Sequence, residues 1–341
     1  MKIAQLLASV AFTLALPLPL RGQERARLDT TVHLNLRGTV DLSLLSGGIM
    51  VRGWDLPDVK ILASTESGTL RFNATSNRVT LRVEQEGKAD GSRGKATYDV
   101  SVPRGTRLLL QTASGNITAN GSQGEISAST VSGALDVSGG RRQVALESVS
   151  GPVKASELAG DLRAQNVSGS VRAENVSGRV EAWTVTGAIR LIGLRANDIH
   201  AETVRGDIVY AGRVATGGTY DLQSHSGTIR LTIPRSTNAQ FRLEAVRGAV
   251  QTDFPIQTAS AGGARNGGRV EFTIGDGRAE VTARTFSGRI LIKSDGGPSI
   301  LSDSPSILRS DSVSRTRKDS TSAPRKNSVP TTRRDSLSTI R

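Results

Sequence analysis

Three histidines are the residues of this chain best suited to bind a metal or to act as a general base. His33, His200 and His225 lie far apart and show no metal-ligand spacing, and the 341-residue sequence contains no cysteine. The lack of cysteine excludes disulfide bonds and thiolate catalysis. We therefore interpret the histidines as surface or corner residues, and we expect no metal and no cofactor.

Paired carboxylates would be a second route to catalysis, because enzymes that cleave polysaccharides direct two acids at one bond. The nearest candidates are Glu157 and Glu174, which differ by one residue in their position after the glycine that precedes each of them. A difference of one residue turns two side chains to opposite faces of a strand. The sequence therefore predicts that the protein is not an enzyme.

Cations at a regular spacing offer a third chemistry. Lys154, Arg172 and Arg190 follow Thr118 and Asp136 at intervals of 18 residues. If these residues stack on adjacent strands, the cations lie about 5 Å apart and form a short row that could contact phosphate or carboxylate groups. The alternative interpretation is that the side chains extend separately into water. Further candidate anion contacts lie near the end of the chain: Arg315, Arg317, Lys318, Arg325, Lys326, Arg333 and Arg334.

An internal repeat must position these side chains. Between Gly115 and Gly187 glycine recurs every nine residues, except that Arg142 occupies one of the positions. Glycine adopts positive φ without steric cost, so each one is expected to form a corner of the chain. The predicted corners are Gly115, Gly124, Gly133, Gly151, Gly160, Gly169, Gly178, Gly187, Gly206, Gly227, Gly248 and Gly288.

The apolar residues of each unit lie two residues before, two after and four after the glycine. In one unit they are Val167, Val171 and Ala173, and this alternation predicts strands that turn all three side chains inward. Ser or Thr precedes every second glycine, so one coil has about 18 residues. A fixed short period is typical of a solenoid. We predict an all-β fold, a parallel β-helix (β-solenoid), whose coils continue in chain order to Gly288.

The two ends of the chain differ from the repeat. Residues 1–23 have the charged start and apolar middle of a signal peptide, which predicts an exported protein in the periplasm, on the outer surface or secreted. Residues 24–297 form the predicted solenoid, and the Ser- and Arg-rich residues 298–341 form a predicted disordered tail. We expect residues 28–37 and 278–294 to protect the two ends of the solenoid from edge-to-edge pairing.

Positive charge is spread over the chain, which has a net charge of +13. The tail carries nine Lys or Arg against four Asp, a net of +5. Such a tail is suited to weak contact with anionic membrane or lipopolysaccharide, or it is simply a solvated spacer. Nucleic acid is not expected as a partner, because no aromatic residues accompany the charges.

Three segments ahead of and within the repeat resemble a known family. Residues 45–55 read Leu-Ser-Gly-Gly-Ile-Met-Val-Arg-Gly-Trp-Asp, residues 98–106 read Tyr-Asp-Val-Ser-Val-Pro-Arg-Gly-Thr, and residues 112–117 read Thr-Ala-Ser-Gly-Asn-Ile. This order resembles the bacterial putative-adhesin family of β-strand-repeat proteins, a domain of unknown function, over roughly residues 30 to 293. The resemblance implies an exported parallel β-helix that is not an enzyme.

These observations predict an exported, non-catalytic β-solenoid that acts as an adhesin-like or structural binding scaffold of the cell envelope. Its partners would be envelope polymers or surface proteins, bound through regular side-chain rows. Two alternatives remain open at this point. One is a polysaccharide-active β-helix enzyme, which would require acids grouped in one groove. The other is an accessory module of envelope signalling.

Overall fold

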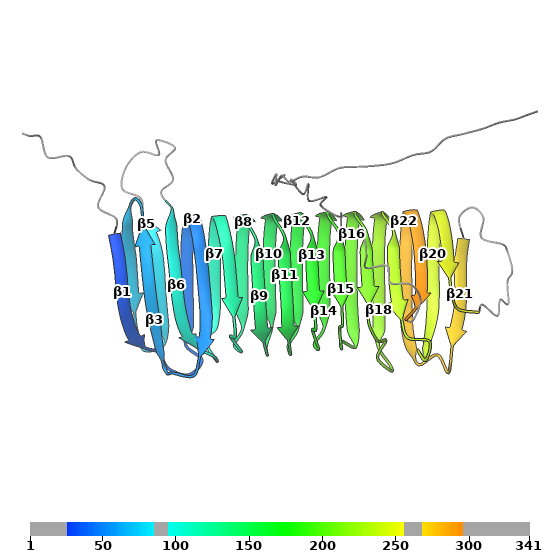
Figure 1. Ribbon diagram of the computed structural model, residues 1–341, viewed down its shortest axis with the longest axis horizontal. Coiled ribbons are helices and arrows are strands. Elements are labelled where there is room, and N and C mark those ends of the chain that lie inside the picture. Colours follow the sequence, from blue (N-terminus) through cyan, green and yellow to red (C-terminus); the bar gives the residue numbers. More distant parts are fainter. Residues whose placement is uncertain (1–25, 85–94, 256–267, 296–341) are drawn as a thin grey trace, which may run out of the picture. The chain divides into compact units, whose positions relative to one another are not determined.

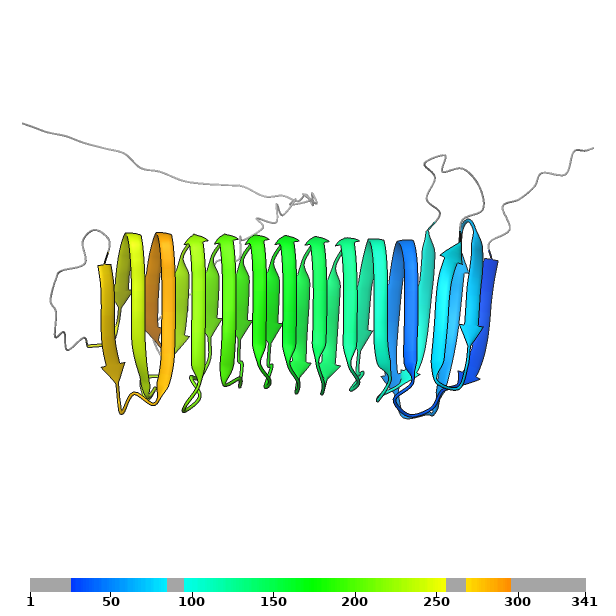
Figure 2. The same ribbon diagram turned by 180° about the vertical axis from the view of Figure 1, so that it is seen from behind.

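The computed structural model describes residues 26–84, 95–255 and 268–295. Every helix or strand in these residues is a β-strand, so the all-β prediction is confirmed. The strands stack side by side in two layers (Figures 1 and 2). The described part of the chain contains no helix that is long and apolar enough to span a membrane.

The central strands alternate between two layers, which we call face A and face B. Face A contains β8 (Ile126–Ser132), β10 (Val144–Ser150), β12 (Leu162–Ser168), β14 (Val180–Thr186), β16 (Asp198–Arg205) and β18 (Thr219–Ser226). Face B contains β9 (Leu135–Gly140), β11 (Val153–Leu158), β13 (Val171–Glu174), β15 (Ile189–Ile192), β17 (Ile208–Ala211) and β19 (Ile229–Ile233). Each strand pairs in parallel with the next strand of its own face.

The register of these pairs follows the repeat of the sequence. Val144 lies opposite Leu162, and Leu162 lies opposite Val180, so one turn of the chain takes 18 residues here and adds one strand to each face. The turn then lengthens, because Val180 lies opposite Ile199 and Ile199 lies opposite Tyr220. The result is a solenoid-like stack in which each coil contacts its two neighbours.

The amino-terminal strands close one end of the stack. They are β1 (Ala26–His33), β2 (Thr39–Trp54), β3 (Asp58–Thr65), β4 (Thr69–Ala74), β5 (Arg78–Glu84), β6 (Ala96–Pro103) and β7 (Arg107–Asn120). The long strands β2 and β7 each bend at a corner and contribute to both faces, and they pair in parallel with each other. On the far side of β2 lie β5 and β6. Antiparallel pairs β4–β5, β3–β6 and β1–β3 complete this end.

The carboxyl-terminal coils do not follow chain order. The last strand, β22 (Ala279–Ser294), pairs with β18 and β19, and β20 (Ala239–Thr252) pairs with the other side of β22. The outermost strand on face A is β21 (Gly268–Ile274), which is antiparallel to β20. The prediction of sequential coils is therefore wrong after Gly227, and residues 278–294 do not protect an end. Strands β20 and β22 carry the same repeat, so either could pair with β18. The order of these coils is therefore decided by pairing between segments far apart in the chain.

The core is a narrow apolar interior filled from both faces. Val171 and Ala173, two and four residues after Gly169, are fully buried. Val167 is 45% exposed, so the prediction that it points inward is wrong. Strand β12 turns Asn166 inward, and alternation then turns Val167 outward just before the corner.

The predicted corner glycines stack on the backbone of the neighbouring coil. A Cβ atom at Gly151 would lie 2.1 Å from the carbonyl oxygen of Gly133, and its φ of 134° favours glycine as well. At Gly160 the Cβ would lie 1.9 Å from the carbonyl oxygen of Arg142. A Cβ would come within 2.4 Å of backbone in the adjacent coil at Gly115, Gly124, Gly133, Gly151, Gly160, Gly169, Gly178, Gly187, Gly206, Gly227, Gly248 and Gly288.

Candidate functional site: an axial groove on face A

The basic row predicted from the sequence lies in register on face B. Lys154 lies opposite Arg172, and Arg172 lies opposite Arg190. Lys154 Nζ lies 3.7 Å from a carboxylate oxygen of Asp136, and Arg172 Nε donates to Glu174 at 2.6 Å. These exposed ion pairs contribute little stability, but they neutralise two of the three cations. Within the described residues only Arg190 of the row has no carboxylate partner, so the row offers little free positive charge.

The remaining predicted cations and the histidines do not form a site in the described residues. Arg315, Arg317, Lys318, Arg325, Lys326, Arg333 and Arg334 lie outside the described residues. His33 Nδ1 lies 3.1 Å from Asp58 Oδ1, whereas His200 and His225 lie on face A. In residues 26–84, 95–255 and 268–295, no group of three or more His, Cys, Asp or Glu side chains could hold a metal ion.

A ladder of buried polar side chains lies inside face A, three residues before each corner glycine. Asn166 Nδ2 donates to the carbonyl oxygen of Gly151 at 2.7 Å, and Thr184 Oγ1 donates to that of Gly169 at 3.2 Å. These bonds fix the corner of the coil below. The ladder consists of Thr112, Thr130, Ser148, Asn166, Thr184, Thr203, Ser224 and Thr285.

One residue further along, an apolar row faces solvent. These residues lie two positions before the corner glycines, and each is between 37% and 55% exposed. The apolar row consists of Leu45, Val131, Val149, Val167, Val204, Val246 and Phe286. Single exposed apolar residues need no explanation, but apolar residues repeated along one line of a surface mark a contact site.

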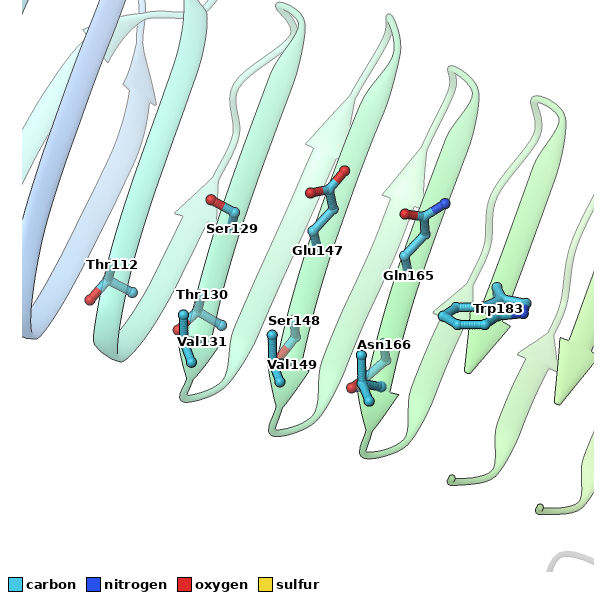
Figure 3. Close-up of a pocket in the computed structure, with 11 residues that line it drawn as sticks. Thr112, Ser129, Thr130, Val131, Glu147, Ser148, Val149, Gln165, Asn166 and Trp183 are labelled. Atoms are coloured by element: carbon cyan, nitrogen blue, oxygen red, sulfur yellow. The ribbon is translucent and has the colours of Figure 1, made fainter. Parts of the chain in front are cut away.

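A mixed polar row runs parallel to the apolar row, four positions before the corner glycines. In it Glu147 lies opposite Gln165, and Gln165 lies opposite Trp183. Figure 3 shows Ser129, Glu147, Gln165 and Trp183 on successive strands, with Val131 and Val149 nearer the corners. The polar row consists of Ser129, Glu147, Gln165, Trp183, Glu202, Gln223, Arg284 and Glu244.

The space between the two rows is the axial groove, and it contains two open hollows. The first has a volume of about 320 Å³ and extends from Thr112 to Trp183. The second has a volume of about 300 Å³ and extends from Glu202 to Phe286. Both rows and the ladder beneath them continue from one hollow to the next, because the strands that carry them are paired in register. The groove can therefore accommodate an extended ligand along the axis of the stack.

The charge of the groove is opposite in sign to that of the whole chain. Glu147 is the one charged residue that lines the first hollow. Glu202 and Glu244 outnumber Arg284 in the second, so each hollow has a formal charge of −1. The chain as a whole carries +13. An anionic polymer would meet carboxylates in this groove.

Aromatic rings lie at two places in the groove. Trp183 belongs to the polar row and is 36% exposed. His225 stacks on Phe286, with ring centroids 4.9 Å apart and an angle of 7° between the rings. The guanidinium carbon of Arg247 lies over the Phe286 ring, 5.2 Å from its centroid.

Sequence reasoning missed this groove because it assigned the apolar row to the core. Valine occupies buried and exposed positions of the same unit, so residue type alone does not separate them. The usable signal is the polar residue three positions before the corner, such as Thr130 or Asn166. If this polar residue faces inward, alternation along the strand requires the next residue to face outward.

The sequence profile of the family described as Toastrack DUF4097 matches residues 65–293. The chain belongs to this family. The predicted resemblance to a family of unknown function is confirmed by this match. No curated protein matches the Toastrack chain.

The chain also matches several solved structures with which it shares little sequence. A putative adhesin from Bacteroides fragilis is 14% identical, with 79% of this chain and 97% of that chain covered and a TM-score of 0.38. A putative adhesin from Parabacteroides merdae is 9% identical, with coverages of 79% and 96% and a TM-score of 0.35. A putative lipid binding protein from Parabacteroides distasonis is 10% identical, with coverages of 79% and 96% and a TM-score of 0.36.

Proposed function

We propose that the Toastrack chain is an exported, non-catalytic scaffold of the cell envelope that holds an extended partner along its side, in an adhesin-like or structural role. The single observation that supports this most directly is the axial groove, which repeats the same polar and apolar rows over successive coils. Such a surface suits many weak contacts with a long ligand.

The two ends of the chain fit the same proposal. Residues 1–23 would direct export, and residues 298–341 would add weak electrostatic contact with anionic membrane or lipopolysaccharide. On this proposal the tail and the groove make separate contributions. Salt distinguishes them, because screening weakens exposed charge contacts far more than apolar contacts.

A pull-down experiment tests the proposal. The mature chain, immobilised, is incubated with peptidoglycan, lipopolysaccharide and acidic polysaccharide over a range of salt concentrations. A matched variant replaces the seven predicted tail cations with Gln, and a second variant replaces Lys154, Arg172 and Arg190 with Gln. We expect retention that persists at high salt and survives both variants. Failure to retain any envelope polymer would contradict the proposal.

A further inference from the structure

The two aromatic sites of the groove indicate the class of ligand that the groove can bind. Among the described residues, Trp183 and Phe286 are the most exposed Trp, Tyr or Phe side chains, at 36% and 39%. Both lie in the axial groove. A ligand that covers these rings would remove their apolar surface from water. Aromatic residues contribute strongly to binding for this reason.

The spacing of these rings fits a chain built from flat, regularly repeated units. Strands β14, β16, β18 and β22 are consecutive on face A, so Trp183 and Phe286 lie three strand spacings apart along the axis, about 14 Å. One strand spacing is close to the length of one pyranose ring in an extended glycan. A glycan could therefore place successive rings over successive strands, stack one of them on Trp183 and pack another against the exposed edge of Phe286.

The side chains between the rings have the chemistry that sugars require. Gln223 Nε2 donates to Asp221 Oδ2 at 2.8 Å, which leaves the Gln223 amide oxygen as an acceptor for hydroxyl groups. The Gln165 amide oxygen accepts from Arg163, which leaves the Gln165 amide nitrogen as a donor for them. The apolar row, Val167 and Val204 among its members, faces the same groove and offers contact to the apolar C–H face of a pyranose. Small-molecule sites combine apolar walls with a few polar groups in this way.

Other ligand classes fit less well. A peptide cannot add as a strand in the middle of face A, because β12 and β14 are hydrogen-bonded on both sides. An acyl chain would remain exposed to water in a groove that is open along one side and lined by carboxylates. An anionic polymer would face Glu147, Glu202 and Glu244, and these three carboxylates outnumber the cations Arg284 and Arg247.

We infer that the axial groove binds a neutral, extended glycan, stacked on Trp183 at one site and packed at the other against the exposed edge of Phe286, whose ring His225 and Arg247 flank. This inference rests on the proposed scaffold function and names the ligand class. Recognition is by ring stacking and hydrogen bonds, so affinity should depend weakly on salt and increase with glycan length until both aromatic sites are covered.

Fluorescence titration of the mature chain tests the inference. The two tryptophans are Trp54 and Trp183, so a Trp54→Phe background makes the emission specific for the groove. The neutral probes are cellohexaose and chitohexaose, with their trisaccharides, and the anionic probe is hexagalacturonate. We expect a neutral hexasaccharide to shift the emission of Trp183 and to bind more tightly than its trisaccharide. Hexagalacturonate should bind at least about tenfold more weakly.

Calorimetry of variants then locates the site. Trp183→Ala and Phe286→Ala should each weaken hexasaccharide binding by about tenfold or more, as expected for aromatic anchors. Trp183→Phe keeps a ring and should lose less affinity, which guards against a folding defect in the alanine variant. Arg190→Gln on face B is the matched control and should bind as the parent does, with thermal melting showing that each variant is folded.

Three results would overturn the inference: no binding of either neutral hexasaccharide, tighter binding of the anionic probe, or affinity that is unchanged in both aromatic variants. The two proposals fail separately. Envelope polymer that is still retained by Trp183→Ala and Phe286→Ala chains would leave the scaffold function intact and would reject the groove as its glycan site.

Discussion

Two valines of one repeat unit provide a sharp test of the inward and outward assignments. Val171, on β13, is fully buried and lies opposite Val153 and Ile189 on the neighbouring strands. Val167 lies four residues earlier on the rim of the axial groove and is 45% exposed. Both residues are β-branched and belong to the same repeat, so Val171→Asp and Val167→Asp form a matched pair.

The structure predicts very different costs for the two substitutions. Loss of a fully buried valine costs about 1.5–3 kcal/mol, and an unpaired carboxylate in the apolar interior costs several more. The free energy of unfolding should therefore fall by about 5 kcal/mol at Val171, which is comparable with the whole stability of many domains. At Val167 the carboxylate stays hydrated, and the change should remain within about 1 kcal/mol.

Urea unfolding measures both effects. Circular dichroism follows all coils, whereas Trp183 fluorescence, in a Trp54→Phe background, reports on the strand next after Val171 in the chain. Because each coil contacts only its neighbours, Val171→Asp should melt the coils around Trp183 before the rest. Equal unfolding midpoints for the two variants would refute the inward and outward assignments of this repeat.

Two further predictions concern the corners and the buried tyrosines. Gly151→Ala would place a Cβ atom 2.1 Å from the carbonyl oxygen of Gly133, at a φ of 134°. This substitution should lower the free energy of unfolding by at least about 2 kcal/mol in the urea assay. Gly105→Ala is the control, because a Cβ atom there would have no atom within 4 Å, and it should change the free energy of unfolding by less than about 0.5 kcal/mol. Burial, reinforced by Tyr220, raises the pKa of the Tyr210 hydroxyl above its ordinary value of about 10. As the pH rises, Tyr210 therefore ionises in the unfolded chain before it ionises in the folded chain. The free energy of unfolding should keep the full contribution of Tyr210 below about pH 10 and lose it as the pH rises further, and Tyr210→Phe should reduce this loss. The same dependence of stability on pH in the parent and in the variant would contradict the prediction.

The local structure of the stack was predictable from the sequence because it depends on short-range pattern. Alternation around Gly169 predicts strands, and glycine at a fixed spacing predicts corners at which coils stack. The burial of Val171 follows from the same alternation. These features repeat many times, so each unit supports the assignment of the next.

The arrangement of the final coils could not be predicted from the same pattern. Strands β20 and β22 both carry the repeat, and β22 occupies the place next to β18 although it comes later in the chain. Nothing within one unit encodes which other unit lies beside it. The segment between Gly248 and Gly288 also contains β21, whose antiparallel pairing with β20 closes face A.

The backbone of each coil forces the residues of the apolar row to face solvent. Ladder bonds such as Asn166 Nδ2 to Gly151 O hold most of these corners against the adjacent coil, and the corner glycines stack too closely on that coil to leave room for a Cβ atom. With the ladder residue fixed inward, the valine after it must point outward. The walls of the groove are therefore set before any ligand arrives, and a rigid site loses little conformational entropy on binding. A surface of this kind suits weak contacts repeated along a chain, because each added unit gains contact without a further cost of ordering the protein.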